Sequence, residues 1–182
     1  MAPELPRHVV FIGMRGSGKT TIGRLVAESL RIQFSDLDDL VLASLHRPSV
    51  VDVWNRYGER TWRQAEAHCL RIDLNAPPHV LSIGGGAPTF ADSRAMLADA
   101  RRAGKAWFVH LIARLDVLAD RIRSGNDRPS VTGDDPVDEL ARLLDARLPI
   151  YESLADVTID TSDGSPQDAV RAILSRLGLT AV

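Results

Sequence analysis

Short apolar runs alternate with helical patterns along most of the chain. Between the runs, apolar residues recur three and four positions apart, as at Ile22, Leu25 and Val26, which is typical of amphipathic helices. Strands that are apolar throughout occur in parallel sheets with helices on both faces, and right-handed crossovers make such a sheet open and doubly wound. The pattern therefore predicts an α/β fold with five parallel strands, at residues 8–13, 32–36, 80–83, 106–112 and 157–160.

The length and composition suit one domain. The 182 residues are 45% hydrophobic and 25% charged, as in average globular proteins, and no repeat, linker or low-complexity tract divides them. We therefore expect a single domain over residues 1–182. Its longest polar stretch, at about residues 124–135 (SGNDRPSVTGDD), lies between two helical patterns and is either an ordinary surface loop or a mobile lid over a ligand.

Charge, cysteine content and hydropathy exclude several functions. A formal net charge of −2 does not indicate a broad nucleic-acid-binding surface, and the single cysteine, Cys69, excludes internal disulfides and cysteine-based zinc sites. The sequence has no run of about 18 apolar residues and no apolar stretch typical of a signal peptide at the N-terminus. We therefore expect a cytoplasmic protein without a membrane span. Nothing in the sequence indicates a large exposed apolar face, so we also expect a monomer.

The segment GMRGSGKT at residues 13–20 matches the phosphate-loop pattern G-x-x-x-x-G-K-[ST], and it lies between a predicted strand and a predicted helix, as the pattern requires. Glycines let the backbone curl so that its N–H groups point at phosphate oxygens, and a helix N-terminus favours the same anion. Lys19 is expected to reach the β- and γ-phosphates, and the Thr20 hydroxyl to ligate Mg²⁺. The expected nucleotide contacts are Gly13, Gly16, Ser17, Gly18, Lys19, Thr20 and Thr21.

A phosphate loop alone does not distinguish a switch, a motor and a small-molecule kinase. A guanine-specific switch carries an N/T-K-x-D segment, and neither lysine of this chain, Lys19 or Lys105, lies in one. Motors are usually larger, with more elements after the loop. A compact five-stranded unit with a candidate lid better suits a kinase of a small acceptor.

Two carboxylates lie at the end of the second predicted strand. Alternation along a strand would place Asp36 and Asp38 on the same side. One of them could then hold Mg²⁺, directly or through water, while the other accepts a proton from the acceptor hydroxyl. The alternative is that the pair serves the following helix, with Asp38 as its N-cap.

Two arginines on separate predicted helices are candidates for binding an acceptor anion. Arg63 and Glu66 lie three positions apart on a helix, so they form either an exposed pair of little energetic weight or a pair in which Glu66 fixes Arg63 for a ligand. Arg147 lies on an apolar stripe, where it either snorkels from the edge or points inward at an anion. Guanidinium binds carboxylate bidentately, so the two arginines indicate a carboxylate-bearing acceptor. The glycines at 84–86 either allow close approach of a ligand or form a flexible turn.

In this order and spacing, the motifs resemble those of the shikimate kinase family, from about residue 11 to residue 177. The phosphate loop continues into Gly-Arg as GMRGSGKTTIGR, and DLD at 36–38 is similar to that family's D-x-D. Four further segments resemble its F-R-x-x-E, G-G-G-A-x-T, lid R-P and R-x-P-x-Y motifs. They are WRQAE, GGGAPT, DRP and RLPIY, at residues 62–66, 84–89, 127–129 and 147–151.

The resemblance implies a fold and a reaction. The fold is that of a P-loop kinase, with the sheet order 2-3-1-4-5, flanking helices and a lid. The reaction is the transfer of a phosphoryl group from ATP, with Mg²⁺, to the 3-hydroxyl of shikimate, a step of aromatic amino-acid biosynthesis. By the same resemblance, Asp38 binds the shikimate hydroxyls and assists the attacking one, and Thr20 and Asp36 serve Mg²⁺.

The resemblance also implies how the remaining polar residues contact the substrates. Arg63 and Arg147 would clamp the shikimate carboxylate, and Arg121 would stack on adenine. Arg128, from the lid, would bind ATP and stabilise charge on the transferring phosphoryl group. The backbone contribution to the acceptor site would come from Gly84, Gly85 and Gly86.

The chain departs from the family pattern at several positions. Trp62 stands where Phe is usual, Arg15 stands where an apolar residue is common, and the candidate lid reads RPSVTG. These differences concern the fit of the acceptor and the closure of the lid, not the class of reaction. Two alternatives stay open: a kinase of a related carboxylate-bearing polyol, of the gluconate or aminoshikimate type, and a nucleotide-binding module without catalysis.

Overall fold

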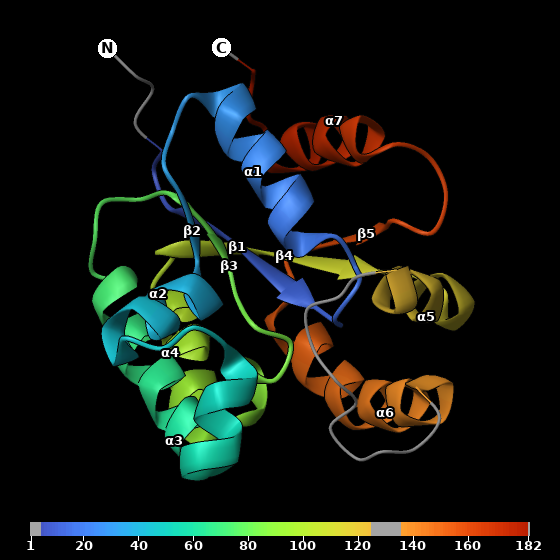
Figure 1. Ribbon diagram of the computed structural model, residues 1–182. Coiled ribbons are helices and arrows are strands. Elements are labelled where there is room, and N and C mark those ends of the chain that lie inside the picture. Colours follow the sequence, from blue (N-terminus) through green and yellow to red (C-terminus); the bar gives the residue numbers. More distant parts are fainter. Residues whose placement is uncertain (1–4, 125–135, 182) are drawn as a thin grey trace.

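The chain folds around one parallel sheet (Figure 1). The computed structural model describes residues 5–124 and 136–181. The strands pair in parallel in the order β2-β3-β1-β4-β5, which confirms the expected α/β fold and sheet order. β2 and β3 are shorter than the apolar runs that predicted them. The strands are β1 (His8–Gly13), β2 (Phe34–Asp36), β3 (Val80–Ser82), β4 (Ala106–Ile112) and β5 (Val157–Asp160).

Helices cover both faces of this sheet. In Figure 1, α1 (Lys19–Leu30) and α7 (Pro166–Leu177) lie side by side over one face, while α4 (Ala91–Arg102) and α6 (Pro136–Leu154) lie over the other. The other helical elements are α2 (Leu37–Leu45), α3 (Val50–Asp73), the short 3₁₀ helix η1 (Ala87–Thr89) and α5 (Leu115–Ser124).

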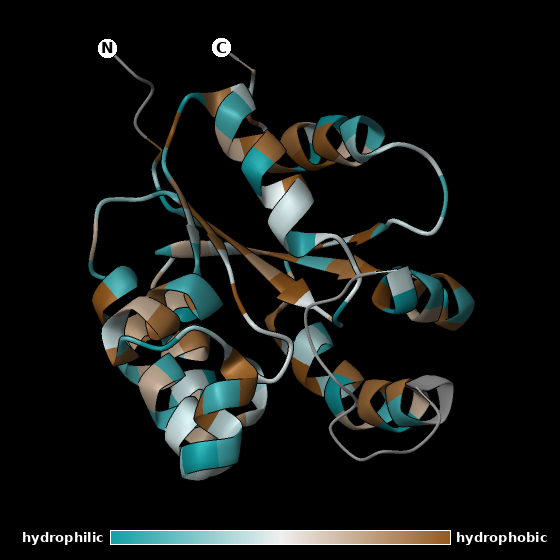
Figure 2. Cartoon of the chain, in the orientation of Figure 1, coloured by the Kyte–Doolittle hydropathy of each residue, from teal (hydrophilic) through white to brown (hydrophobic). Residues whose placement is uncertain are grey.

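The central strand β1 supplies side chains to two separate cores. Val9 and Phe11 pack with α1 and α7, whereas Val10 and Ile12 pack with the helices of the opposite face. All four side chains are fully buried, because successive residues of a strand point to opposite faces and both faces are covered. This arrangement explains the uninterrupted apolar run, and Figure 2 shows the hydrophobic strands between helices whose outer sides are polar.

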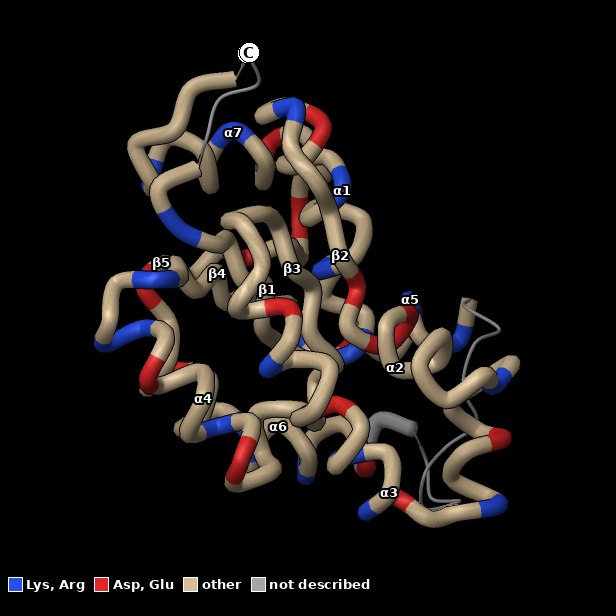
Figure 3. Tube along the Cα trace, turned by 90° about the vertical axis from the view of Figure 1, so that its left-hand side faces the viewer, with Lys and Arg blue, Asp and Glu red and all other residues tan. Residues whose placement is uncertain are grey.

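Charged residues of both signs are interspersed along the helices, as Figure 3 shows for α3 and α4. Within residues 5–124 and 136–181, no helix is both long and apolar enough to cross a membrane.

A glycine divides α3 into two helical segments. Gly58 has φ 79° and ψ 164°, a conformation that residues with a Cβ rarely adopt. The segment after this break buries Trp62 in the core and carries Arg63 and Glu66. The break therefore sets the direction in which these two charged side chains enter the molecule.

The carboxyl ends of β1, β2 and β3 meet at one edge of the sheet. Ser82 of β3 pairs in register with Phe11 on one side and Asp36 on the other. The loops that follow the three strands are consequently neighbours, which is the usual position of a ligand site in an open α/β sheet.

Asp36 and Asp38 are related differently from the sequence-based prediction. β2 ends at Asp36 and α2 begins at Leu37, so strand alternation does not place the two carboxylates on one side, and that prediction is wrong. The interpretation with Asp38 as the helix cap is also wrong. Asp36 is the N-cap of α2, and its Oδ1 accepts a hydrogen bond from the Asp38 N–H at 3.1 Å. This cap turns the chain into a helix directly after the strand, and both carboxylates still line one cleft.

Candidate active site

The phosphate loop connects β1 to α1 and presents an uncapped helix N-terminus. Gly16 and Gly18 have φ values of 82° and 94°, in the region that glycine adopts without steric cost. Gly18 is the N-cap of α1, and no side chain caps the helix there. The first N–H groups of α1 are therefore left for a ligand, and they suit a phosphate group.

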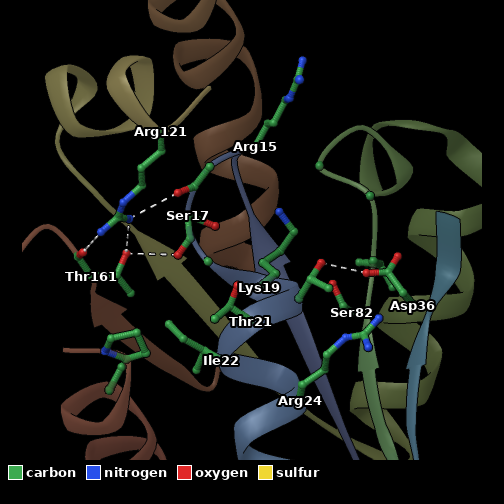
Figure 4. A pocket seen from close by; sticks show the side chains of 18 of the residues that line it. Arg15, Ser17, Lys19, Thr21, Ile22, Arg24, Asp36, Ser82, Arg121 and Thr161 are labelled. Carbon is green, nitrogen blue, oxygen red and sulfur yellow. Dashed lines mark hydrogen bonds between the residues drawn. The ribbon is translucent and has the colours of Figure 1, made fainter. Parts of the chain in front are cut away.

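Lys19 lies across this loop. Its Nζ donates hydrogen bonds to the carbonyl oxygens of Gly13, at 3.0 Å, and Met14, at 2.9 Å, and the side chain is buried. The ammonium group is thus held at the bottom of a cleft of about 1090 Å³ that the phosphate loop lines. Figure 4 shows Lys19 between Asp36 and Ser82 on one side and the Arg121–Thr161 pair on the other.

The Thr20 hydroxyl donates a hydrogen bond to Asp36 Oδ2 at 2.8 Å. Burial raises the pKa of Asp36, as does neighbouring Asp38, whereas the hydrogen bond from Thr20 lowers it. In the described ranges, no group of three or more His, Cys, Asp or Glu side chains could hold a metal. One hydroxyl and one carboxylate do suit Mg²⁺, which keeps several waters and takes further oxygens from phosphates.

Arg121 of α5 joins the phosphate loop to the segment after β5. Its guanidinium donates to the carbonyl of Gly16 at 3.2 Å and to the carbonyl of Thr161 at 2.6 Å. The Thr161 hydroxyl accepts from the same guanidinium at 3.2 Å and lies 3.0 Å from the Ser17 carbonyl. Arg121 also lines the cleft at the phosphate loop, which we call the nucleotide cleft. The stacking of Arg121 on adenine stays a prediction. Sequence reasoning missed Thr161, which carries no motif.

Arg63 and Glu66 form a buried ion pair, not an exposed one. Arg63 Nη1 lies 2.6 Å from Glu66 Oε2, and a second carboxylate, on Glu59, accepts from Arg63 Nη2 at 3.0 Å. Glu66 is completely buried and Arg63 nearly so. Burial raises the pKa of Glu66 to about 7, although Arg63 acts in the opposite direction. The spacing predicted the pair correctly, and its burial supports the interpretation that Glu66 orients Arg63.

The glycine turn after β3 allows the site's charged groups to approach the backbone. A Cβ on Gly84 would lie 2.7 Å from Glu66 Oε1 and 2.8 Å from Asp38 Oδ1. A Cβ on Gly86 would collide with the Arg63 guanidinium. These residues are thus glycines because charged side chains occupy the space that a methyl group would fill. The turn is therefore not merely flexible, and the close approach of a ligand to it stays a prediction.

Replacing Gly84 by alanine is therefore expected to displace two carboxylates. We predict that Gly84→Ala lowers kcat/KM for the acceptor at least about tenfold, because small misplacements of reacting groups are costly, while KM for the nucleotide stays unchanged. Steady-state kinetics with each substrate varied in turn would measure this. Gly104→Ala is the control: no atom lies within 4 Å of its Cβ position and its φ is +66°, so it should lower stability alone. An equal fall in kcat/KM for the acceptor and for the nucleotide in Gly84→Ala would contradict the prediction.

Arg147 enters the same region from α6. It is half-buried, and it lines a second hollow of about 390 Å³ together with Arg63, Glu66 and the glycine turn. A Cβ on Gly85 would lie 3.6 Å from Arg147 Nη1. The inward interpretation of this arginine on an apolar stripe is thus supported, and two guanidinium groups from different helices border one pocket.

The nucleotide cleft and the second hollow adjoin each other at the glycine turn and the phosphate loop. Gly84, Gly85 and Arg15 line both of them. A phosphoryl group held by the loop would therefore face a small molecule held between Arg63 and Arg147. Arg128 and nearly all of the candidate lid, 125–135, lie outside the described residues.

A buried histidine of the central sheet packs against Tyr151. His110 of β4 packs against the Tyr151 ring with a centroid distance of 5.1 Å, and among the described residues its Nδ1 has no hydrogen-bond partner. Burial lowers the pKa of His110 from 6.5 to about 4, and the charge of Lys19 contributes. The imidazole is therefore neutral at neutral pH.

The lowered pKa of His110 makes stability depend on pH. Between pH 6.5 and pH 4, the unfolded chain binds a proton at this residue that the folded protein does not, so acidification favours unfolding. From about pH 7 to about pH 5, wild type should lose about 2 kcal/mol more stability than His110→Gln. Urea denaturation at both pH values measures the difference, in which any constant cost of the substitution cancels. Equal losses of stability in wild type and His110→Gln would show that the pH dependence does not come from His110.

The fold and the site define a P-loop kinase with a pocket for a small, anionic acceptor. A family model described as shikimate kinase matches residues 15–178. The chain belongs to the shikimate kinase family.

Individual relatives agree with the family model. The shikimate kinase of Caulobacter vibrioides is 37% identical over 97% of this chain and 85% of its own length. The shikimate kinase of Mesorhizobium japonicum is also 37% identical, over 94% of this chain and 81% of its own length. Among solved structures, shikimate kinase from Acinetobacter baumannii in complex with shikimate superimposes with a TM-score of 0.87 at 29% identity, covering 96% of this chain and 94% of that one.

Proposed function

We propose that this protein transfers the γ-phosphoryl group of ATP to the 3-hydroxyl of shikimate, giving shikimate 3-phosphate and ADP. One observation carries the proposal beyond family membership: two guanidinium groups and a carboxylate gather around a glycine turn that adjoins the phosphate loop. The guanidinium groups, of Arg63 and Arg147, suit the carboxylate of the acceptor. The carboxylate, of Asp38, suits its hydroxyls.

In this proposal the protein acts by positioning its substrates and neutralising their charge. Arg63 and Arg147 bind the shikimate carboxylate and so orient the ring. Asp38 accepts a hydrogen bond from the attacking hydroxyl and takes its proton as the new O–P bond forms. The bond between the γ-phosphorus and the β–γ bridging oxygen breaks, and ADP leaves with that oxygen.

Residues around the nucleotide prepare it for this transfer. Lys19 and the N–H groups at the start of α1 neutralise the phosphates. Thr20 and Asp36 would hold Mg²⁺, which when bound offsets further charge on the β- and γ-phosphates. Arg121 would contact the adenine, and Arg128 would stabilise charge on the transferring group. Every residue in this scheme comes from one chain, so we infer that the monomer is active.

The identity of the product tests the proposal directly. After incubation with Mg-ATP and shikimate, ³¹P NMR with proton coupling should show one new phosphomonoester, coupled to the proton on C3 of the ring. EDTA in excess over Mg²⁺ should suppress the signal. Phosphate on a different hydroxyl, or no new ester from protein that binds ADP, would overturn the proposed reaction.

A further inference from the structure

Tyr151 of α6 reaches from the core to the glycine turn of the acceptor pocket. Its hydroxyl lies 2.6 Å from the Gly85 carbonyl and 3.8 Å from Met14 Sδ. A phenol has one proton to donate, and the much closer carbonyl receives it. The tyrosine side chain is completely buried, so this contact belongs to the framework of the site.

The hydrogen bond to Gly85 fixes more than one carbonyl group. The peptide between Gly85 and Gly86 is trans and planar, so holding its carbonyl also holds its N–H, which points in the opposite direction. Among the described residues, the Gly86 N–H has no hydrogen-bond partner. Gly86 also lies directly against the Arg63 guanidinium. An unused amide donor is thereby held beside a cation of the acceptor pocket.

Arg147 lies on the same side of α6, four residues before Tyr151, where side chains of a helix are neighbours. A Cβ on Gly85 would lie 3.4 Å from the Tyr151 hydroxyl and 3.6 Å from Arg147 Nη1. Burial raises the pKa of Tyr151, and the charges of Arg147 and Arg63 oppose that rise. The hydroxyl is therefore close to the Arg147 guanidinium.

The tyrosine ring is itself held in place from the other side. His110 of β4 packs against it at 45° between the ring planes. Pro149, which removes a backbone donor from the helix, lies inside α6 between Arg147 and Tyr151.

We propose that Tyr151 is a positioning residue for the acceptor: its hydroxyl holds the glycine turn so that the Gly86 N–H and the Arg147 guanidinium meet the acceptor carboxylate together. Tyr151 touches no substrate and acts through Gly85. This inference rests on the proposed function, since it assigns a geometric role to one group within the same site.

The test is the substitution Tyr151→Phe, which removes one oxygen atom and leaves the ring. Losing a buried hydrogen bond and freeing the Gly85 carbonyl should raise KM for shikimate about tenfold, with KM for ATP and kcat within about twofold of wild type. A role in stability alone would lower the melting temperature and leave both KM values unchanged. Tyr57→Phe is the matched control, because Tyr57 is the only other tyrosine, is half exposed, and has its hydroxyl bonded to Arg47.

A second readout does not depend on turnover. In protein labelled with ¹⁵N-glycine, shikimate should shift the Gly86 amide signal in wild type and in Tyr57→Phe, and shift it much less in Tyr151→Phe at the same concentration. An unchanged shikimate KM in Tyr151→Phe, or an equal rise in both KM values, would overturn the inference. Failure of the proposed function can be told apart from failure of this inference, because wild type itself would then not use shikimate. The wild type and Tyr151→Phe would in that case be compared with the acceptor that the protein does phosphorylate.

Discussion

Lys19→Met is expected to lower kcat at least about a hundredfold, since removing one preorganised charge-stabilising group commonly has an effect of that size. The ammonium group lies in the nucleotide cleft. The only other lysine of the chain, Lys105, precedes β4 at the opposite edge of the sheet. The Lys19 ammonium group also bonds the carbonyls of Gly13 and Met14, so its loss should loosen the phosphate loop. Turnover at saturating ATP and acceptor measures the effect.

The other lysine provides the control for this experiment. Lys105 is exposed in the turn before β4, and Lys105→Met changes the net charge by the same amount. Its kcat should equal that of wild type. A normal kcat in Lys19→Met would mean that the loop does not bind the transferred phosphates, and the assignment of this segment would fail.

Arg147→Ala is expected to act on the acceptor and spare the nucleotide. A charged hydrogen-bonding partner would be lost from the acceptor pocket, which should raise the acceptor KM between about tenfold and about a hundredfold. Arg147 lines the acceptor hollow and not the nucleotide cleft, so KM for ATP should stay within about twofold. Kinetics with each substrate varied, together with calorimetric titration of ADP and shikimate, would separate the two effects.

Arg176→Ala controls for the loss of positive charge as such. Arg176 is exposed near the end of α7, and its replacement should leave both KM values as in wild type. If Arg147→Ala weakened ATP and the acceptor equally, its assigned role would be wrong, because a carboxylate clamp has no reason to act on the nucleotide.

The sheet could be predicted because burial on both faces leaves a strong mark on a sequence. A strand such as β1, whose successive side chains enter two cores, must be apolar at every position, and its ends can be read directly. Asp38 shows the limit of this reasoning. The apolar pattern did not distinguish a strand that continues to Asp38 from a strand that ends at Asp36. The preference of Asp for helix N-cap positions was the one local signal in favour of the second.

The candidate site was predictable where a motif or a misplaced charge marks it. The phosphate loop is an explicit pattern, and Arg147 stands out as a cation on an apolar stripe. Burial of the Arg63–Glu66 pair was not predictable, since spacing fixes only which side chains meet. Tyr151 ends the RLPIY motif, but the sequence analysis assigned it no role of its own. A tyrosine on an apolar stripe looks like any core residue, and only the fold brings its hydroxyl to Gly85.

The most direct test of the central claim is ADP release with Mg-ATP and shikimate, measured beside gluconate and a blank without acceptor. We predict release that depends on shikimate, with a turnover of roughly 1–10³ s⁻¹, the usual range for enzymes, and only background rates with gluconate or no acceptor. Release that is absent, or equal with and without shikimate, from folded protein that binds ADP would contradict the assignment of this acceptor pocket to shikimate.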